Sequence, residues 1–193
     1  MIFVEKQRIS KVVFIGYRGT GKTVLSRMLA EKLKWELLNT DETIQKNAGM
    51  KIPQIVEKFG WPYFRNLEKE LAKEISRMEK AMVVDTGGGM VTNEENAANL
   101  KKNGIIILLE AEKEKIFERI STDSNRPSLI KGASQLEEII QKLAERTPIY
   151  KRLADFTIDT SIEKPEESLK QILAFLETKG IKPFASKSLG KKC

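Results

Sequence analysis

Short apolar runs alternate with longer amphipathic segments along most of this 193-residue chain. The apolar runs have the length of strands buried on both faces, and they span residues 11–16, 36–38, 81–84, 104–109 and 154–158. The segments between them carry apolar residues at helical spacing, as residues 22–33 do. Because strands that alternate with helices favour a parallel sheet covered on both faces, the pattern predicts a five-stranded, three-layer α/β fold.

Two segments depart from this alternation. Residues 41–78 contain about three helical patterns between the second and third strands, which is too much for a simple crossover. We expect an inserted region there that holds a substrate. Residues 121–134 have the polar, glycine-bearing composition of a loop, and we expect a mobile lid. Residues 1–178 are predicted to form one domain, and residues 179–193 a basic flexible tail.

The composition fits one globular domain, because 40% of the residues are hydrophobic and 32% are charged. The longest unbroken aliphatic run, 105–109, is far shorter than the ~20 residues that span a bilayer. Residues 1–10 lack the apolar stretch of a signal peptide, and the single cysteine, Cys193, permits no internal disulfide. We therefore expect a soluble protein of the reducing cytoplasm.

The chain contains no histidine, which excludes Ser/His and Cys/His mechanisms and histidine-based metal sites. Acid and base catalysis would fall to carboxylates. Lysine and arginine outnumber aspartate and glutamate by 34 to 27, so the formal net charge is +7. Such a charge attracts anionic ligands, but it does not by itself distinguish a nucleotide from a nucleic acid.

Residues 16–23, Gly-Tyr-Arg-Gly-Thr-Gly-Lys-Thr, match the phosphate-binding pattern G-x-x-x-x-G-K-[ST]. They lie between a predicted strand and a predicted helix. In a P-loop the backbone N–H groups and the helix dipole hold phosphate, the lysine reaches the β and γ oxygens, and the hydroxyl ligates magnesium. We therefore predict binding of ATP with Mg²⁺, with Lys22 also acting in catalysis. The predicted nucleotide contacts are Gly19, Thr20, Gly21, Lys22, Thr23 and Val24.

Further motifs follow the P-loop in order. They are Asn-Thr-Asp at 39–41, Phe-Gly-Trp-Pro-Tyr-Phe-Arg-Asn-Leu-Glu at 59–68, Thr-Gly-Gly-Gly at 86–89, Asn-Arg-Pro at 125–127, Arg-Thr-Pro-Ile-Tyr at 146–150, and Asp-Thr at 159–160 with Pro165 beyond. In these motifs the chain from 16 to 160 resembles the shikimate kinases, which are relatives of the nucleoside monophosphate kinases. The resemblance implies a P-loop NTPase fold and transfer of the γ-phosphate of ATP to the 3-hydroxyl of shikimate.

The resemblance also implies roles for individual residues. Arg65 and Arg146 would clamp the carboxylate of shikimate, because a guanidinium donates two parallel hydrogen bonds to a carboxylate. Asp41 would contact shikimate and accept or orient the proton of its hydroxyl. The other implied contacts are Glu68, which supports the arginine; Gly87, Gly88 and Gly89, around the ring; Arg119 and Pro165, against adenine; and Arg126, the catalytic charge of the lid.

Asn39 departs from the family, which usually has an aspartate there that helps to hold the water shell of magnesium. Asp85 follows the apolar run 81–84, and P-loop enzymes commonly place a magnesium-positioning aspartate after such a strand. Our hypothesis is that Asp85 supplies the missing charge to the metal, either directly or through a coordinated water, while Thr23 is a metal ligand and Asn39 acts only through a water. The alternative is that Asp85 caps the glycine turn.

Other interpretations are still open at this point. Arg65 and Glu68, three residues apart on a predicted helix, could be an ordinary surface pair, and Arg146 could be a cation on a solvated helix. A kinase for another small acid or sugar such as gluconate would use the same P-loop. So would a non-catalytic ATP-binding module that regulates a partner or binds nucleic acid. We favour shikimate and ATP as ligands of a monomer, with neither a membrane nor a specific nucleic acid as partner.

Overall fold

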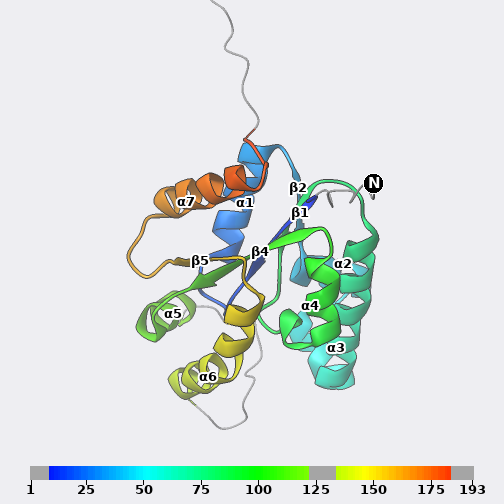
Figure 1. Ribbon diagram of the computed structural model, residues 1–193. Helices are drawn as coiled ribbons and strands as arrows, with labels where there is room; N and C mark the ends of the chain where they lie inside the picture. Colours follow the sequence, from blue (N-terminus) through cyan, green and yellow to red (C-terminus); the bar gives the residue numbers. More distant parts are fainter. Residues whose placement is uncertain (1–8, 122–133, 184–193) are drawn as a thin grey trace, which may run out of the picture.

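The computed structural model describes residues 9–121 and 134–183 as an α/β protein (Figure 1). Its strands are β1 (Lys11–Ile15), β2 (Glu36–Asn39), β3 (Met82–Asp85), β4 (Gly104–Glu110) and β5 (Phe156–Asp159). Its helices are α1 (Lys22–Leu33), α2 (Thr40–Ala48), α3 (Ile52–Arg77), α4 (Glu94–Lys101), α5 (Lys113–Ile120), α6 (Gln135–Leu153) and α7 (Pro165–Thr178), with the short 3₁₀ helix η1 (Met90–Thr92). The predicted alternation of strands and helices is confirmed.

The strands form one sheet in the order β2-β3-β1-β4-β5, and every neighbouring pair is parallel. The chain passes from β3 on one side of β1 to β4 on the other. A topological switch point therefore lies at the carboxyl end of β1, where open α/β sheets bind ligands. At the same end, Asn39 of β2 lies opposite Asp85 of β3. The predicted five-stranded parallel sheet is confirmed.

Both faces of the sheet are buried, because successive side chains of a strand point to opposite faces. In β1, Val13 and Ile15 join a core cluster with α2, α3 and α4, whereas Val12 and Phe14 join a second cluster with α1 and α7. Figure 1 shows α1 and α7 on one side of the sheet and α3 and α4 on the other. This is the predicted three-layer arrangement.

The inserted region between β2 and β3 is built from α2 and α3. Helical geometry in α3 is interrupted at Gly60, whose φ is 81°, in the left-handed region that glycine adopts without a steric cost. Pro62 follows two residues later, in the first turn of the second helical stretch, where a missing N–H is tolerated. The helical patterns predicted within residues 41–78 are therefore α2 and the two parts of α3.

The predicted flexible tail, 179–193, needs a correction at its start. Ile181 is 8% exposed and packs in the core cluster of α1 and α7, because its N–H donates to the carbonyl oxygen of Leu176 and turns the chain back onto α7. The folded part thus extends past residue 179. The predicted lid falls almost entirely on residues 122–133, so it lies outside the described residues, and Arg126 lies there too. No helix among the described residues has the length and apolar character needed to cross a membrane.

Candidate active site

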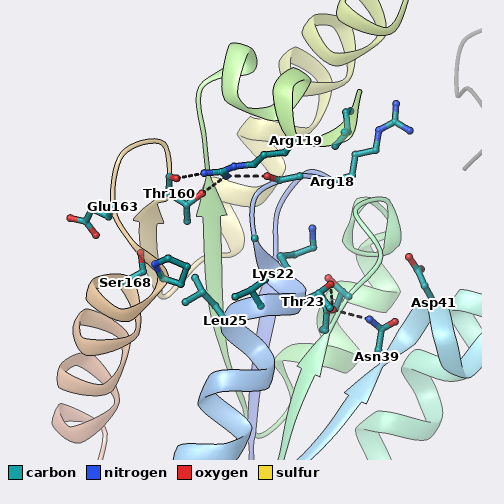
Figure 2. A pocket seen from close by; sticks show the side chains of 17 residues that line it. Arg18, Lys22, Thr23, Leu25, Asn39, Asp41, Arg119, Thr160, Glu163 and Ser168 are labelled. Atoms are coloured by element: carbon teal, nitrogen blue, oxygen red, sulfur yellow. Dashed lines mark hydrogen bonds between the residues drawn. The ribbon is translucent and has the colours of Figure 1, made fainter. Parts of the chain in front are cut away.

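The P-loop joins β1 to α1 and points the N-terminus of α1 into a cavity (Figure 2). Gly19 has a φ of 80°, and a Cβ there would lie 2.7 Å from Cγ2 of Ile120, so this position requires glycine. Lys22 Nζ donates hydrogen bonds to the carbonyl oxygens of Gly16 (2.9 Å) and Tyr17 (2.8 Å). The loop itself therefore holds the ammonium group at the place where phosphate would bind.

The cavity has a volume of about 440 Å³ and extends from the P-loop to α7, which is a size typical of small-molecule sites. Predicted nucleotide contacts that line it are Gly19, Gly21, Lys22, Thr23, Val24, Arg119 and Pro165. The side chain of Thr20 has a different place: it is 1% exposed, and its hydroxyl donates to the carbonyl oxygen of Tyr17 at 2.8 Å. This side chain stabilises the loop from within.

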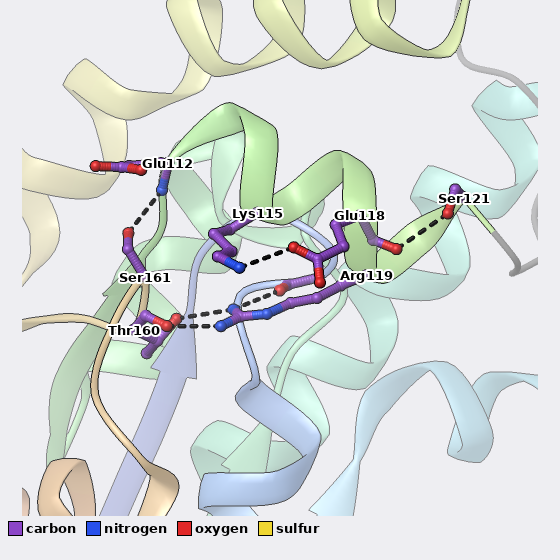
Figure 3. A network of polar contacts seen from close by, with 8 residues as sticks. Glu112, Lys115, Glu118, Arg119, Ser121, Thr160 and Ser161 are labelled. Carbon is purple, nitrogen blue, oxygen red and sulfur yellow. Dashed lines mark hydrogen bonds and ion pairs between the residues drawn. The ribbon is translucent and has the colours of Figure 1, made fainter.

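Arg119 connects three parts of the cavity wall (Figure 3). From α5, its Nη1 donates to the carbonyl oxygen of Gly19 and to Oγ1 of Thr160, both at 3.1 Å, and its Nη2 donates to the carbonyl oxygen of Thr160 at 2.6 Å. Oγ1 of Thr160 also lies 3.1 Å from the carbonyl oxygen of Thr20. The P-loop, α5 and the loop after β5 are thus held together, and sequence reasoning missed the part that Thr160 has in this network.

The end of the cavity at α7 contains a hydroxyl group that sequence reasoning also missed. Ser168 is 1% exposed and lines the cavity, and its Oγ has no hydrogen-bond partner among the described residues. A buried hydroxyl without a partner costs free energy, so this end is suited to a ligand with hydrogen-bonding groups, as a nucleotide base has. The only signal in the sequence was a polar residue next to the apolar positions of the last helix.

Asp85, Thr23 and Asn39 form a hydrogen-bonded unit at the carboxyl ends of β2 and β3. Oδ2 of Asp85 accepts from Oγ1 of Thr23 (2.7 Å) and from Nδ2 of Asn39 (2.8 Å). Oδ1 of Asn39 accepts from the N–H of Glu42 at 3.0 Å and so caps α2. Asp85 is 3% exposed, and its carboxylate is held directly beside the threonine of the P-loop.

A second cavity lies between α3, α6 and the glycine triplet, and its polar lining is largely the predicted acceptor site. The predicted residues that line it are Asp41, Arg65, Glu68, Gly87, Gly88, Gly89 and Arg146. Nη1 of Arg65 donates to Oε2 of Glu68 at 2.6 Å, and Glu68 is 1% exposed. The interpretation of these two residues as an ordinary surface pair is therefore wrong, because the carboxylate is buried and positions the guanidinium.

The glycine triplet allows two of these side chains to approach the backbone. A Cβ at position 87 would lie 2.5 Å from Oδ1 of Asp41, and one at position 89 would lie 2.5 Å from Nη1 of Arg65. Any other residue at either position would displace a side chain of the cavity. The carbonyl oxygen of Gly88 accepts a hydrogen bond from the hydroxyl of Tyr150, so α6 fixes the middle of the triplet.

Arg146 is 9% exposed and lines the same cavity from α6. Its Cζ lies 5.9 Å from the centroid of the Tyr17 ring, which places it over an aromatic face of the P-loop. The interpretation of Arg146 as a cation on a solvated helix is therefore wrong. Two arginines from different helices, Arg65 and Arg146, face one cavity, and this arrangement suits an anion.

Burial sets the electrostatics of this cavity. It raises the pKa of Glu68, and the nearby guanidinium of Arg65 opposes this effect. It also raises the pKa of Tyr150, so the phenol stays protonated and donates to Gly88. The cavity therefore combines two buried carboxylates with arginine side chains, and these residues are Asp41, Glu68, Arg18, Arg65 and Arg146.

Comparison with known proteins shows which family this chain is similar to. A family model described as shikimate kinase matches residues 18–177. A shikimate kinase of Thermodesulfovibrio yellowstonii is 41% identical over 86% of this chain and 94% of its own length, and one of Caldanaerobacter subterraneus is 40% identical over 89% and 99%. The structure of a shikimate kinase from Acinetobacter baumannii in complex with shikimate superposes with a TM-score of 0.83 at 32% identity, covering 91% of this chain and 97% of that one. With a family match over most of its length and relatives of this identity, the chain belongs to the shikimate kinase family.

Proposed function

We propose that this chain transfers the γ-phosphate of ATP to the 3-hydroxyl of shikimate, giving shikimate 3-phosphate and ADP. The observation that carries this proposal is the meeting of two cavities at Asp41, which lines both of them. One cavity contains the P-loop, and the other contains two arginines suited to a carboxylate. A phosphate donor and an acidic acceptor would therefore be presented to each other at this aspartate.

Binding of the acceptor falls to Arg65 and Arg146, which would donate paired hydrogen bonds to its carboxylate. Glu68 fixes the orientation of Arg65 through their 2.6 Å contact. Asp41 then faces the hydroxyl that reacts. The oxygen of the acceptor's hydroxyl forms a bond to the γ-phosphorus of ATP, and the bond from that phosphorus to the β,γ-bridging oxygen breaks, so that ADP leaves with that oxygen. Asp41 accepts the proton of the hydroxyl.

Thr23 and Asp85 are the residues that would hold Mg²⁺. A metal-binding group of three or more acidic or cysteine side chains is absent from the described part of the chain, but Mg²⁺ commonly binds through one or two protein oxygens together with phosphate oxygens and water. The donor set therefore fits this ion, which when bound neutralises charge on the β- and γ-phosphates. Asn39 would act by orienting Asp85, because both ends of its amide are already hydrogen-bonded.

Positive charge at the γ-phosphate would come from Lys22 and, in our proposal, from Arg126 of the predicted lid. Phosphoryl transfer depends mainly on positioning and on charge neutralisation. Arg119 and Pro165, which line the first cavity, would contact adenine. We also propose that the enzyme acts as a monomer in the cytoplasm.

The test is an assay of ADP formation with ATP and Mg²⁺, in which shikimate, gluconate and nucleoside monophosphates are supplied separately. We expect turnover with shikimate and not with the other acceptors, and a product whose mass exceeds that of shikimate by one phosphoryl group, HPO₃. Turnover with gluconate instead would show a different acceptor. Binding of ATP without turnover on any acceptor would favour a non-catalytic module.

A further inference from the structure

Arg18 is the third residue of the P-loop, and no role in the site described so far belongs to it. Among the described residues, only Arg18 and Asp41 line both cavities. One is a cation and the other a carboxylate. Figure 2 shows Arg18 extending from the loop on the same side of the first cavity as Asp41 and opposite Glu163 and Ser168. Arg18 therefore lies at the junction through which a phosphoryl group would pass.

A buried carboxylate holds the guanidinium of Arg18 in place. Nη2 of Arg18 donates to Oε1 of Glu138 at 2.6 Å, where the side chains are 18% and 2% exposed. Nε of Arg18 is buried without a hydrogen-bond partner among the described residues. A guanidinium has five N–H donors, so the contact with Glu138 leaves donors for a further acceptor at the junction.

The helix that carries Glu138 also carries Arg146, about two turns further along. The Arg18–Glu138 ion pair thus connects the P-loop to the helix that supplies one of the two acceptor-binding arginines. This connection links the position of the phosphate donor to that of the acceptor. It also offsets the repulsion expected among the clustered cations Arg18, Lys22 and Arg146.

We propose that Arg18 is a catalytic residue that contacts the γ-phosphoryl group during transfer, and that Glu138 positions it. The inference rests on the proposed function, since it presumes that ATP and an acceptor occupy the two cavities. During transfer, negative charge spreads over the equatorial oxygens of the phosphoryl group, and an arginine placed beside them, supplied by the same chain or by a partner, is typically worth about 10³–10⁵ in kcat. Arg18 comes from the P-loop itself, so its charge is in position as soon as ATP binds.

The test uses Arg18→Met, which removes the charge but keeps an apolar stem, and Arg18→Lys, which keeps the charge but loses the planar fork. We expect Arg18→Met to lower kcat by on the order of 100-fold or more, with KM for ATP and shikimate changed by less than about threefold. Arg18→Lys should recover part of kcat. Glu138→Gln, which removes the charge that holds the guanidinium of Arg18, should lower kcat by about tenfold.

A binding measurement separates this role from a structural one. ADP with aluminium fluoride mimics the transferring phosphoryl group, and we expect Arg18→Met to weaken its binding in the presence of shikimate by the same factor as kcat. Binding of ADP alone should not change, because the interaction is specific to the transition state. The matched control is Arg152→Met, which makes the same substitution on α6, the helix that carries Glu138. It breaks an exposed ion pair with Glu94 and should leave all these values unchanged.

Several results would overturn the inference. A folded Arg18→Met variant with kcat within about threefold of the wild type would do so, as would a variant that loses affinity for shikimate while keeping kcat. If Arg18→Met does not fold, wild-type kcat in both Arg18→Lys and Glu138→Gln would overturn it. Wild-type protein without turnover on shikimate would refute the proposed function and this inference together, whereas an active wild type and an equally active Arg18→Met refute the inference alone.

Discussion

The carboxylate of Asp85 accepts hydrogen bonds from Thr23 and Asn39, and these contacts make the three side chains one unit. The amide of Asn39 is used at both ends, since Nδ2 donates to Asp85 and Oδ1 caps α2. An aspartate at position 39 would keep the cap but lose the donor. Two carboxylates would then meet, and each would disfavour ionisation of the other. At the scale of single residues, the carboxylate beside Thr23 can therefore come from position 39 or from position 85. Carboxylates at both positions would repel each other and lower the stability of the protein.

Exchanging the two side chains tests this relation. Asp85→Asn should raise the Mg²⁺ concentration needed for half-maximal rate, because the negative charge beside Thr23 is lost. Asn39→Asp alone should destabilise the protein by about 1–3 kcal/mol in the absence of Mg²⁺. The double variant Asn39→Asp/Asp85→Asn restores a donor and an acceptor, so it should regain stability and part of the Mg²⁺ affinity. The measurements are Mg²⁺ titrations of activity and of ADP binding, together with urea unfolding.

A normal Mg²⁺ dependence in Asp85→Asn would contradict the proposed metal role of Asp85. If the destabilisation in the double variant equalled the sum of the two single effects, the two side chains would not be coupled. These two results concern different claims, because the first tests the metal and the second tests the hydrogen bond.

Removal of either acceptor-binding arginine should affect one substrate only. Arg65→Ala or Arg146→Ala should weaken binding of shikimate by on the order of 100-fold, which is the expected loss for a charged hydrogen-bonding partner. Binding of ADP should change little, because both residues line the second cavity and not the first. Trp61 lines the second cavity as well, so its fluorescence can report the binding of shikimate.

Unchanged affinity for shikimate in both variants would contradict the assignment. Arg146→Lys serves as a control, since it keeps the charge but cannot donate two parallel bonds, and an intermediate affinity is expected. Arg65→Ala should in addition lower stability, because it leaves the buried Glu68 without the cation that opposes the rise of its pKa.

At the scale of elements, the strands were the most predictable part, since runs buried on both faces are continuous in the sequence and end at glycine or polar residues. The P-loop was predictable for the same reason, because its residues are contiguous. The break in α3 was harder to predict, because it depends on the left-handed φ of a single glycine, Gly60. The helical spacing of apolar residues continues on both sides of this glycine and gives no sign of the break. The Arg18–Glu138 and Arg119–Thr160 contacts join residues 120 and 41 positions apart, and no local pattern indicates such pairs.

The loop after β3 gives a prediction at this scale. Gly89 has an ordinary φ of −97°, so an alanine fits the backbone, but its Cβ would lie 2.5 Å from Nη1 of Arg65. Gly89→Ala should therefore displace the guanidinium and raise KM for shikimate by about tenfold, without changing KM for ATP. The effect should disappear in an Arg65→Ala background, because the group that is displaced is then absent. An equal effect in both backgrounds would mean that Gly89 acts on the backbone and not through Arg65.

At the scale of the whole molecule, the candidate active site and the buried amine of Lys11 lie at opposite ends of the central strand of the parallel sheet. The site lies at the carboxyl ends of the strands, whereas Lys11 is the first residue of β1, at the opposite end. Lys11 is 0% exposed, and its Nζ has no hydrogen-bond partner among the described residues. Burial lowers the pKa of Lys11, and the charge of Lys102 lowers it further. The central strand therefore begins with a buried amine that has no hydrogen-bond partner within residues 9–121 or 134–183.

The last prediction concerns the stability of the folded chain. Folding lowers the pKa of Lys11, so the unfolded chain binds this proton more tightly than the folded chain does. Above the ordinary pKa of 10.5 the amine is neutral in both states and its burial carries no charge penalty. As the pH falls through the folded-state pKa, the amine becomes charged and the protein loses stability. The full cost of burying the charge is present at pH values below the folded-state pKa. Lys11→Met keeps the apolar stem and removes the charge, so it should raise the free energy of unfolding by on the order of 1 kcal/mol at pH 7. That gain should shrink as the pH rises towards 10.5, and kcat should not change. Lys32→Met, an exposed control on α1, should stay within about 0.5 kcal/mol of the wild type. A gain that is absent at pH 7, or equally large at pH 7 and 10.5, would show that the buried charge of Lys11 is not the cause.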